Sequence, residues 1–353
     1  MNKPKSALKG TLRIKKADLC VYRKSSDTAE RWEKTTIKLP EALQAIKLFQ
    51  AHHNLSALID KKNPQFLKGQ LYQDKIQGAR LNILPDGRKV DKAYSLFAPH
   101  LTIHDETSNE HWDVIYQNPN GAYAYVYTLD KKDKAVQAKY KKVKLFEKHY
   151  PQLEKNVTSA LRDKNDEAAL AMYTLLKTYM RVGNEIYYKA HGHKGLTTLT
   201  KKDISIKGKT VIFTYLGKSG VPRKITETFP PAYVNRLQQH LQGLKNQDFV
   251  FTTSSGHPLP EDHFKRAFKN YCGVEFYPHI VRSYYATSVV KDFLKKHRTA
   301  TKEEVKNLFL SVAEKLGHKK FSQKKQQWED SFNVTIHHYI EPSLVEKVKG
   351  IVK

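Results

Sequence analysis

Residues 279–287 read HIVRSYYAT, and the expected organisation of the second half of the chain follows from this stretch. His279 and Arg282 stand three residues apart, where a helix is expected to begin. One helical turn brings residues at this spacing to the same face, so the two side chains can share one phosphate group. Taken alone such a pair is weak evidence, and its meaning depends on the rest of the sequence.

Helical patterns lie on both sides of this stretch. Residues 303–316 (EEVKNLFLSVAEKL) carry apolar side chains at three- and four-residue steps. Gly317 follows them, where a glycine commonly caps the end of a helix. Apolar residues recur at the same steps from Leu153 to Tyr188, which predicts a long helix there.

Two regions of the chain have strand patterns. DISI (203–206), TVIFTY (210–215) and residues 221–228, with a turn at 216–220, predict a small sheet within the helical half. Upstream, from about Gln70 to Lys139, runs of β-branched and aromatic residues alternate with turn signals. Those runs are ARLNIL, WDVIYQ and AYAYVYTL, broken by PDG and NPNG. The clearest predicted hairpin turns at Pro119–Gly121.

The chain is therefore expected to belong to the α+β class. Its 353 residues exceed one ordinary domain and suggest two. We expect a β-rich domain over residues 61–145, followed by a mainly α domain with a small sheet over residues 146–353. Residues 1–60 are basic and weakly patterned, and only a short helix within residues 34–50 is indicated there.

The charge of the chain is strongly unbalanced. It has 62 Lys and Arg against 35 Asp and Glu, a formal net charge of +27. Such a charge destabilises a compact protein by self-repulsion unless a polyanion is its usual partner. Nucleic acid is the first candidate for that partner, and an anionic membrane surface the second.

Cysteine content and hydropathy limit the class of protein further. Cys20 and Cys272 form no C-x-x-C pair, so neither a disulfide framework nor a cysteine zinc site is indicated. Residues 1–10 (MNKPKSALKG) have no apolar stretch after them, which argues against a secretory signal. No run approaches the ~20 apolar residues of a membrane span. We expect a soluble intracellular protein located with nucleic acid, in the cytoplasm or nucleoid, or in a nucleus or virion depending on the host.

The second half of the chain contains the residue types needed to cleave a phosphodiester. Without a metal, this reaction needs a nucleophile, cations that hold the non-bridging oxygens, and an acid for the departing oxygen. No carboxylate cluster has metal-ligand spacing, so no metal or other cofactor is expected and basic side chains would replace it. The candidates are Arg181 in RVGNEIYY, Lys218 in FTYLGKSG, His279 and Arg282, His318 in AEKLGH, and Tyr339 in HYIEP.

Each candidate also has an ordinary structural interpretation. Arg181 can be a solvated helix arginine, His318 an exposed histidine, and Tyr339 is one of 20 tyrosines. Gly217-Lys218-Ser219 resembles part of a nucleotide-binding P-loop, but that motif needs glycine where Ile212 stands and it opens a helix. Lys218 is instead expected at a hairpin tip, from which it can reach a DNA backbone and protonate a leaving 5′ oxygen.

In this order the motifs resemble the catalytic constellation of type IB DNA topoisomerases and tyrosine recombinases. The compact poxvirus-like and bacterial type IB enzymes are the more similar. Their first arginine segment resembles RVGNEIY with GLTTL (195–199), and their lysine hairpin resembles FTYLGKSG. Their second arginine segment resembles FYPHIVRSYYAT, their histidine AEKLGH and their nucleophile HYIEP. Residues 112–140 resemble their DNA-clasping sheet, so the resemblance covers roughly residues 70–350.

The resemblance implies a DNA breaking-rejoining fold and relaxation of supercoiled duplex DNA through a 3′-phosphotyrosine intermediate. It makes Tyr339 the nucleophile and Lys218 the general acid. Arg181, Arg282 and His318 would stabilise charge on the phosphate, with His279 as a further hydrogen-bond donor. Neither ATP nor an essential metal is implied, because the phosphotyrosine stores the bond energy. The residues expected to contact DNA are Tyr187, Thr197, Thr198, Ser219, Gln137 and Tyr140.

Two positions depart from the topoisomerase pattern. His279 stands where topoisomerases usually have lysine and recombinases have histidine, so its charge would depend on pH. A polar, lysine-bearing insertion at 319–337 separates His318 from Tyr339 much further than in the poxvirus-like enzymes. Either this insertion loops out or the catalytic histidine equivalent is another residue. The alternatives are Asn333, His337 and His338.

Two other functions stay open at this point. A tyrosine recombinase shares the cleavage step but needs site-specific synapsis of several protomers, and it usually has a helical domain where this chain is β-rich. A non-catalytic DNA-binding protein would leave the five motifs unexplained. A sheet domain and a helical domain joined by a short linker suggest a monomer that clamps duplex DNA. Deleting residues 1–140 would then weaken binding far more than it alters the chemistry.

Overall fold

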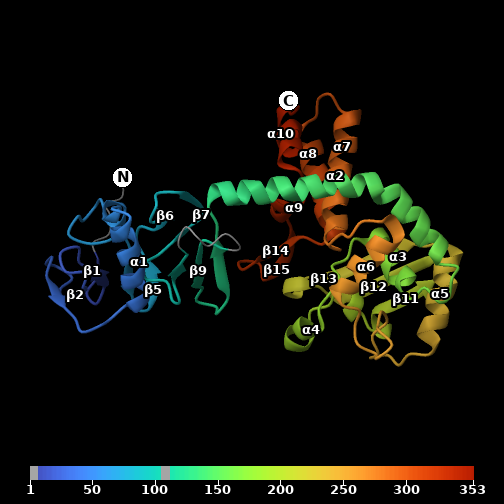
Figure 1. Ribbon diagram of the computed structural model, residues 1–353, viewed down its shortest axis with the longest axis horizontal. Coiled ribbons are helices and arrows are strands. Elements are labelled where there is room, and N and C mark those ends of the chain that lie inside the picture. Colours follow the sequence, from blue (N-terminus) through green and yellow to red (C-terminus); the bar gives the residue numbers. More distant parts are fainter. Residues whose placement is uncertain (1–6, 105–111) are drawn as a thin grey trace. The chain divides into compact units, whose positions relative to one another are not determined.

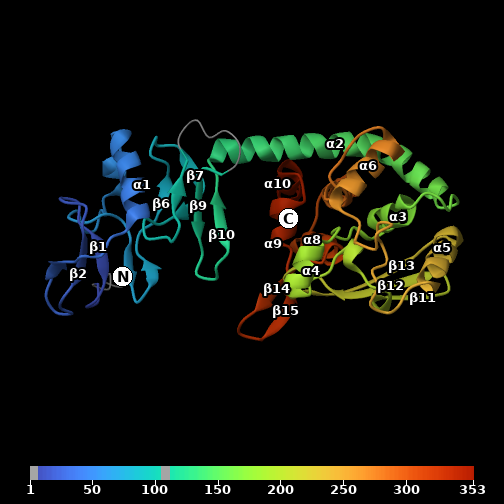
Figure 2. The same ribbon diagram turned by 60° about the horizontal axis from the view of Figure 1, so that its bottom comes forward.

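The computed structural model describes residues 7–104 and 112–353. The chain divides into two units, Met1–Ala138 and Lys139–Lys353 (Figures 1 and 2). The division falls within one long helix, α2 (Leu129–Ala160). The boundary predicted at residue 145 therefore lies inside the second unit, and residues 1–60, which the sequence left without a domain assignment, fall within the first. Residues 129–139, which the sequence patterns placed in the strand-rich region, form the first part of α2, so this helix begins before the predicted boundary.

The described part of the first unit consists of antiparallel sheets and a helix around one core. The largest sheet has the strand order β3-β2-β1-β4-β5, and a second has the order β10-β9-β8. Ile14, Phe49 and Tyr94, which come from two different sheets and the helix, belong to a single buried cluster. The elements are β1 (Leu12–Ile14), β2 (Val21–Lys24), β3 (Trp32–Lys34), α1 (Pro40–Ala51), β4 (Gln70–Tyr72), β5 (Lys75–Gln77), β6 (Leu81–Ile83), β7 (Lys89–Tyr94), β8 (Thr102–Ile103), β9 (Val114–Gln117) and β10 (Tyr123–Val126).

Two local predictions for this unit are confirmed. β9 and β10 pair antiparallel, with Tyr125 opposite Ile115, so the chain turns back where Pro119–Gly121 was predicted to turn. The short helix predicted within residues 34–50 is α1, which begins at Pro40. Proline suits the first position of a helix because the amide hydrogen that it lacks has no partner there.

The second unit is mainly helical and contains a three-stranded sheet, as predicted. The sheet has the order β11-β12-β13, and the predicted turn joins β12 to β13. Its helices after α2 are α3 (Ala168–Thr178), α4 (Glu185–His191), α5 (Pro231–Gln242), α6 (Glu261–Cys272), α7 (Ile280–Lys296), α8 (Lys302–Leu316), α9 (Asn333–His338) and α10 (Pro342–Gly350). Its strands are β11 (Ile204–Lys207), β12 (Thr210–Leu216), β13 (Pro222–Thr228), β14 (Lys319–Ser322) and β15 (Gln327–Asp330).

The long helix predicted from Leu153 to Tyr188 is wrong. The chain leaves α2 after Ala160, and carboxylates bond backbone amides in the turn that follows, as Asp166 does with the amide of Ala169 at 3.1 Å. It leaves helical geometry again at Tyr179, which is left-handed with φ 55°. Apolar spacing continues through both breaks because each helix buries a face in the same core. Arg181 therefore lies in the loop that follows α3 and not within a helix.

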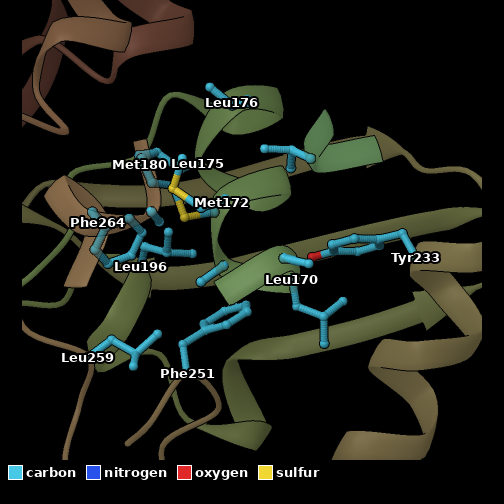
Figure 3. Close-up of a cluster of buried hydrophobic side chains, with 14 of the residues drawn as sticks. Leu170, Met172, Leu175, Leu176, Met180, Leu196, Tyr233, Phe251, Leu259 and Phe264 are labelled. Carbon is cyan, nitrogen blue, oxygen red and sulfur yellow. The ribbon is translucent and has the colours of Figure 1, made fainter. Parts of the chain in front are cut away.

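The core of the second unit lies against α3. Figure 3 shows Leu170 and Met172 of α3 in one buried cluster with Tyr233 of α5 and Phe264 of α6. Complete burial of a side chain of this size stabilises a fold by ~1.5–3 kcal/mol. Met180 belongs to the same cluster and directly precedes Arg181, so the core anchors the loop that carries this arginine.

A second buried cluster joins α7, α8 and α10, which lie together at one end of this unit (Figure 1). The predicted helix at 303–316 is confirmed as α8, with Thr301 as its N-cap and Gly317 as its left-handed C-cap. Tyr339 and Ile340 are part of this cluster. The predicted insertion 319–337 does not loop out without structure, because it folds as the hairpin β14–β15 followed by α9.

None of the helices in the described part of the chain has the length and apolar character required to cross a membrane.

Candidate active site

The hydroxyl of Tyr339 lies among the basic side chains that the motifs singled out. Tyr339 directly follows α9, is 3% exposed, and its Oη accepts a hydrogen bond from Nη2 of Arg181 at 2.8 Å. The ring centroids of His318 and His279 lie 4.6 and 5.2 Å from that of the tyrosine. The guanidinium carbon of Arg282 lies 5.2 Å from the same centroid. Three separate stretches of sequence thus converge on the side chain of Tyr339.

The GLTTL motif holds the loop that carries Arg181. The amides of Leu196 and Thr197 donate to the carbonyls of Arg181 and Val182, at 2.8 and 2.7 Å. A Cβ atom at Gly195 would lie 2.6 Å from the carbonyl oxygen of Arg181, so only glycine allows this close approach. The two parts of the first arginine motif are therefore one packed unit.

Arg282 is buried in α7 and bonds groups from two other elements. It is 2% exposed, and it donates to the carbonyls of Tyr179 and Leu316, the latter at 2.8 Å. Its Nη2 also donates to Nε2 of His318 at 3.1 Å. Its Nε is buried without a partner. Burial lowers the pKa of Arg282 to about 10, so the group stays charged at neutral pH.

The neighbours of His318 determine its tautomer. A guanidinium can only donate, so Nε2 accepts from Arg282 and the ring proton resides on Nδ1. Nδ1 then donates to Oγ1 of Thr335 at 2.8 Å, and Thr335 is completely buried. Burial first, and then the charges of Arg282 and Arg181, lower the pKa of His318 to about 3. His318 is therefore neutral at pH 7.

His279 is the N-cap residue of α7 and, unlike His318, its side chain is exposed. Desolvation and then the charges of Arg282, Arg181, Lys139 and Lys218 lower its pKa to about 3. Because the ring is exposed, desolvation acts on it weakly, and the neighbouring cations account for the lowered pKa. His279 is thus neutral at pH 7 in the absence of a bound anion.

Lys218 lies at the turn between β12 and β13, as predicted, and lines a cavity of about 290 Å³. The same cavity is lined by Arg181, Arg282 and His318. Ser219 beside the lysine has the positive φ of 63° that this tight turn requires. The hairpin therefore brings the lysine to the cavity formed by the other motifs.

Two lysines at this cavity are paired with carboxylates, Lys194 with Asp203 and Lys319 with Asp330, but in the described ranges the cations of the motifs are not. Among the residues that the structure describes, no carboxylate forms an ion pair with Arg181, Lys218 or Arg282. Charges left uncompensated in a partly buried site favour an anionic ligand. The cavity is therefore suited to a group such as a phosphate. In the same described part of the chain, no three His, Cys, Asp or Glu side chains are placed to hold a metal ion.

The structure corrects three of the predicted DNA contacts. Thr197 and Thr198 are 1% and 0% exposed, and their hydroxyls bond the carbonyls of Val182 and Gly195. Tyr140 is 6% exposed and its hydroxyl donates to a backbone carbonyl. These side chains have no surface to offer DNA and instead support the site. The other three predicted contacts are exposed: Tyr187 on α4, Ser219 at the hairpin turn and Gln137 on α2.

The alternatives to His318 do not lie in the cavity. Asn333 and His337 are exposed residues of α9, and His338 meets the site through its backbone carbonyl, which accepts from Lys139. His318 contacts both Arg282 and the ring of Tyr339, so the long insertion does not displace it.

Three residues near the nucleophile were not singled out by the sequence: Thr335, Thr287 and Lys139. Thr335 orients His318, and Thr287 Oγ1 donates to the carbonyl of Tyr339 at 3.4 Å. The Lys139 Nζ lies 5.4 Å from the centroid of the Tyr339 ring. Thr287 closes the HIVRSYYAT motif and Lys139 lies in the segment 112–140, but nothing in either pattern singled out these two side chains, and Thr335 stands outside every motif.

Arg181 holds the hydroxyl of Tyr339 beside Arg282 and Lys218, cations without an acidic partner in the described part of the chain, on a helical unit with a small sheet. This arrangement defines the class that unites type IB topoisomerases and tyrosine recombinases. The family model described as eukaryotic DNA topoisomerase I, catalytic core, matches residues 129–339, more than half of the chain. The chain belongs to this family, and it thus carries a DNA breaking-and-rejoining catalytic core.

Comparison with solved structures gives distant similarities. The XerH site-specific recombinase bound to difH substrate in a pre-cleavage complex is 15% identical, with 48% of this chain and 44% of that chain covered and a TM-score of 0.32. The XerA recombinase is 16% identical, with 57% and 61% covered and a TM-score of 0.34. This chain thus covers less than two thirds of either recombinase. No curated protein sequence matches it.

Proposed function

We propose that this chain is a type IB DNA topoisomerase, which relaxes supercoiled duplex DNA through a 3′-phosphotyrosine intermediate. The observation that carries the proposal is the hydroxyl of the buried Tyr339, bonded by Arg181 beside Arg282 and Lys218, which form no ion pair with a carboxylate among the described residues. A DNA phosphodiester supplies both the missing negative charge and a phosphorus atom for the hydroxyl to attack.

The chemistry is a reversible transesterification. Oη of Tyr339 attacks the scissile phosphorus, a phosphorus–tyrosine bond forms, and the bond to the 5′ oxygen breaks. Lys218 gives its proton to that oxygen, and the phenol proton passes to water. Arg181 and Arg282 hold the charged oxygens of the transition state. His318 orients Arg282 before DNA binds, and donates to a phosphate oxygen from Nε2 once the ring proton moves there.

The link between DNA and tyrosine conserves the energy of the broken bond. The cut strand rotates to release supercoiling, and the 5′ hydroxyl then attacks the phosphotyrosine to restore the strand. We propose that the enzyme needs neither ATP nor an essential metal, and that it acts as a monomer clamping duplex DNA. Its net charge of +27 favours that partner. The exposed residues Gln137, Tyr187 and Ser219 are proposed DNA contacts.

One observation favours a tyrosine recombinase as the second candidate. The ring of His279 lies 5.2 Å from that of Tyr339, at the position where the sequence motif resembles recombinases more than topoisomerases. A recombinase would perform the same cleavage but only at its own target sequence.

The test is relaxation of negatively supercoiled plasmid in EDTA without ATP. We expect the unchanged protein to relax the plasmid and Tyr339→Phe to lose all activity, because the phenol oxygen forms the covalent bond. Tyr277→Phe, which removes an exposed hydroxyl, is the matched control and should be fully active. The trapped product should carry protein at a 3′ end and leave a 5′ hydroxyl that a polynucleotide kinase can phosphorylate.

Other results would redirect the assignment. Plasmid binding without relaxation by the unchanged protein would reject the topoisomerase and lead to a search for a recombination site. Relaxation by Tyr339→Phe would leave the reaction in place but reject this tyrosine as nucleophile.

A further inference from the structure

Three side chains of α2 contact the residues on either side of Tyr339. The hydroxyl of Tyr140 donates to the carbonyl of Ile340 at 2.6 Å, and Lys139 donates to the carbonyl of His338. Lys144 forms an ion pair with Glu341 at 3.0 Å. The contacts therefore fall on the residue before the proposed nucleophile and on the two residues after it. Lys139, Tyr140 and Lys144 are called the α2 clasp below.

The clasp is a continuous feature of one helix face. Tyr140 and Lys144 are four residues apart and so project from the same face of α2. Lys139 also places its ammonium group 5.3 Å from the ring centroid of Tyr140 and 5.4 Å from that of Tyr339. A cation at that distance favours the negative charge that develops on a phenol oxygen as it becomes a nucleophile.

The segment that carries Tyr339 needs such support because helical hydrogen bonding ends there. Tyr339 is the C-cap residue of α9, with φ −127° and ψ −22°, and its amide makes the last bond of that helix, to the carbonyl of Thr335 at 2.9 Å. The carbonyls of His338 and Ile340 point at α2, and that of Tyr339 accepts from Thr287 of α7. Side chains of two other helices thus define where this stretch of backbone lies.

We propose that the α2 clasp is a positioning device, which sets the distance between the Tyr339 hydroxyl and the phosphorus that it attacks. The inference rests on the proposed function and extends it to residues outside the five catalytic motifs. Its importance follows from the steep dependence of rate on geometry, since a displacement of ~1 Å can slow a reaction by ~10²-fold.

The test is single-turnover cleavage, at saturating enzyme, of a nicked duplex that contains a mapped cleavage site. The clasp variants are Tyr140→Phe and Lys144→Met. Matched controls come from the same helix: Tyr150→Phe removes a hydroxyl that bonds Glu154 within α2, and Lys148→Met removes an exposed charge. Tyr140→Phe should slow cleavage about three- to tenfold, the net value of one hydrogen bond, with unchanged DNA affinity. The controls should match the unchanged protein.

A substrate with sulfur in place of the 5′ bridging oxygen separates positioning from acid catalysis. A thiolate leaves without a proton, so this substrate should rescue Lys218→Ala but not Tyr140→Phe. Rescue of Tyr140→Phe, or cleavage by it at the unchanged rate, would overturn the clasp. A slower rate that disappears when the enzyme is saturating would also overturn the clasp, since Tyr140 would then act in DNA binding.

Amide hydrogen exchange tests the clasp without any activity. In the full chain, Tyr140→Phe should speed exchange in residues 335–341 relative to Tyr150→Phe. Equal exchange in the two variants would reject the clasp even if the chain cleaves DNA. A protein that forms no covalent adduct, yet shows the faster exchange, would retain the clasp and lose the proposed function.

Discussion

Arg282 shows how a single residue organises this site. It is 2% exposed and bonds the carbonyls of Tyr179 and Leu316, while its Nε keeps no partner. An arginine buried without a counter-ion is costly while the cavity holds no anion, and binding an anion offsets that cost. The same charge, after burial itself, keeps His318 neutral. Cations in this cavity therefore set the protonation of their neighbours.

The low pKa of His318 predicts a loss of stability in acid. The pKa is lowered from 6.5 to about 3 in the folded chain, so between these values the unfolded chain binds a proton that the folded chain does not. The contribution of the neutral His318 to the free energy of unfolding is fully present above pH 6.5. It is lost as pH falls toward 3, at up to ~1.4 kcal/mol per pH unit. Urea unfolding at pH 7 and pH 5 should show a smaller pH effect in His318→Gln than in the unchanged protein. The exposed His191→Gln is the control, and an equal effect in both variants would reject the assignment.

The C-terminal end of α8 contacts the lysine hairpin at Gly317. Arg223 of β13 donates to the carbonyls of Glu314 and Lys315, both at 3.0 Å, and so caps the helix that leads to His318. A Cβ atom on Gly317 would lie 2.3 Å from the guanidinium carbon of Arg223. The glycine thus permits both the left-handed turn and the contact between two catalytic elements.

Gly317→Ala should therefore lower the free energy of unfolding by more than the cost of holding alanine in a left-handed conformation. Gly273 is also a left-handed C-cap, with φ 79°, and has open space where its Cβ would lie, so Gly273→Ala isolates the conformational cost of ~1–2 kcal/mol. Chemical denaturation should show a larger loss of stability for Gly317→Ala than for Gly273→Ala, because Arg223 must release the carbonyls of Glu314 and Lys315. The double variant Gly317→Ala with Arg223→Ala should lose less stability than the sum of the losses in the two single variants. Equal costs at the two glycines would contradict this account.

At the scale of the whole molecule, α2 belongs to both units. It begins at Leu129 in the first and carries the clasp in the second. The deletion of residues 1–140 considered from sequence would remove Lys139 and Tyr140 together with the first unit. Binding and chemistry would then fail together, so a deletion that tests DNA binding has to end before α2.

Deleting residues 1–128 should weaken DNA binding and leave cleavage at saturating enzyme within a few-fold of the full chain. A protein with 6–10 phosphate contacts loses roughly 10³–10⁵ in affinity between 50 and 200 mM salt, and fewer contacts give a shallower slope. Binding titrations over this range should therefore show lower affinity and a smaller salt dependence for the shortened chain. Undiminished affinity would reject a role of the first unit in holding DNA.

Features that depend on nearby residues could be predicted from the sequence alone. The Pro119–Gly121 turn, the apolar stripe of α8 with its Gly317 cap, and the Lys218 hairpin each follow from spacing within a short window. The motif order likewise indicated which side chains to examine, since each motif fixes its own local backbone.

How those pieces meet became visible only in the folded chain. It brought Arg181 within 2.8 Å of the Tyr339 hydroxyl and buried Thr197 and Thr198 behind the arginine loop. It also revealed the α2 clasp, whose Tyr140 lies 200 residues from its partner Ile340. Apolar periodicity shows that a face is buried but not which element packs against it. The apolar spacing therefore continues through the turn after Ala160 although the helix ends there. Partners distant in the chain are chosen by packing, and no local pattern records that choice.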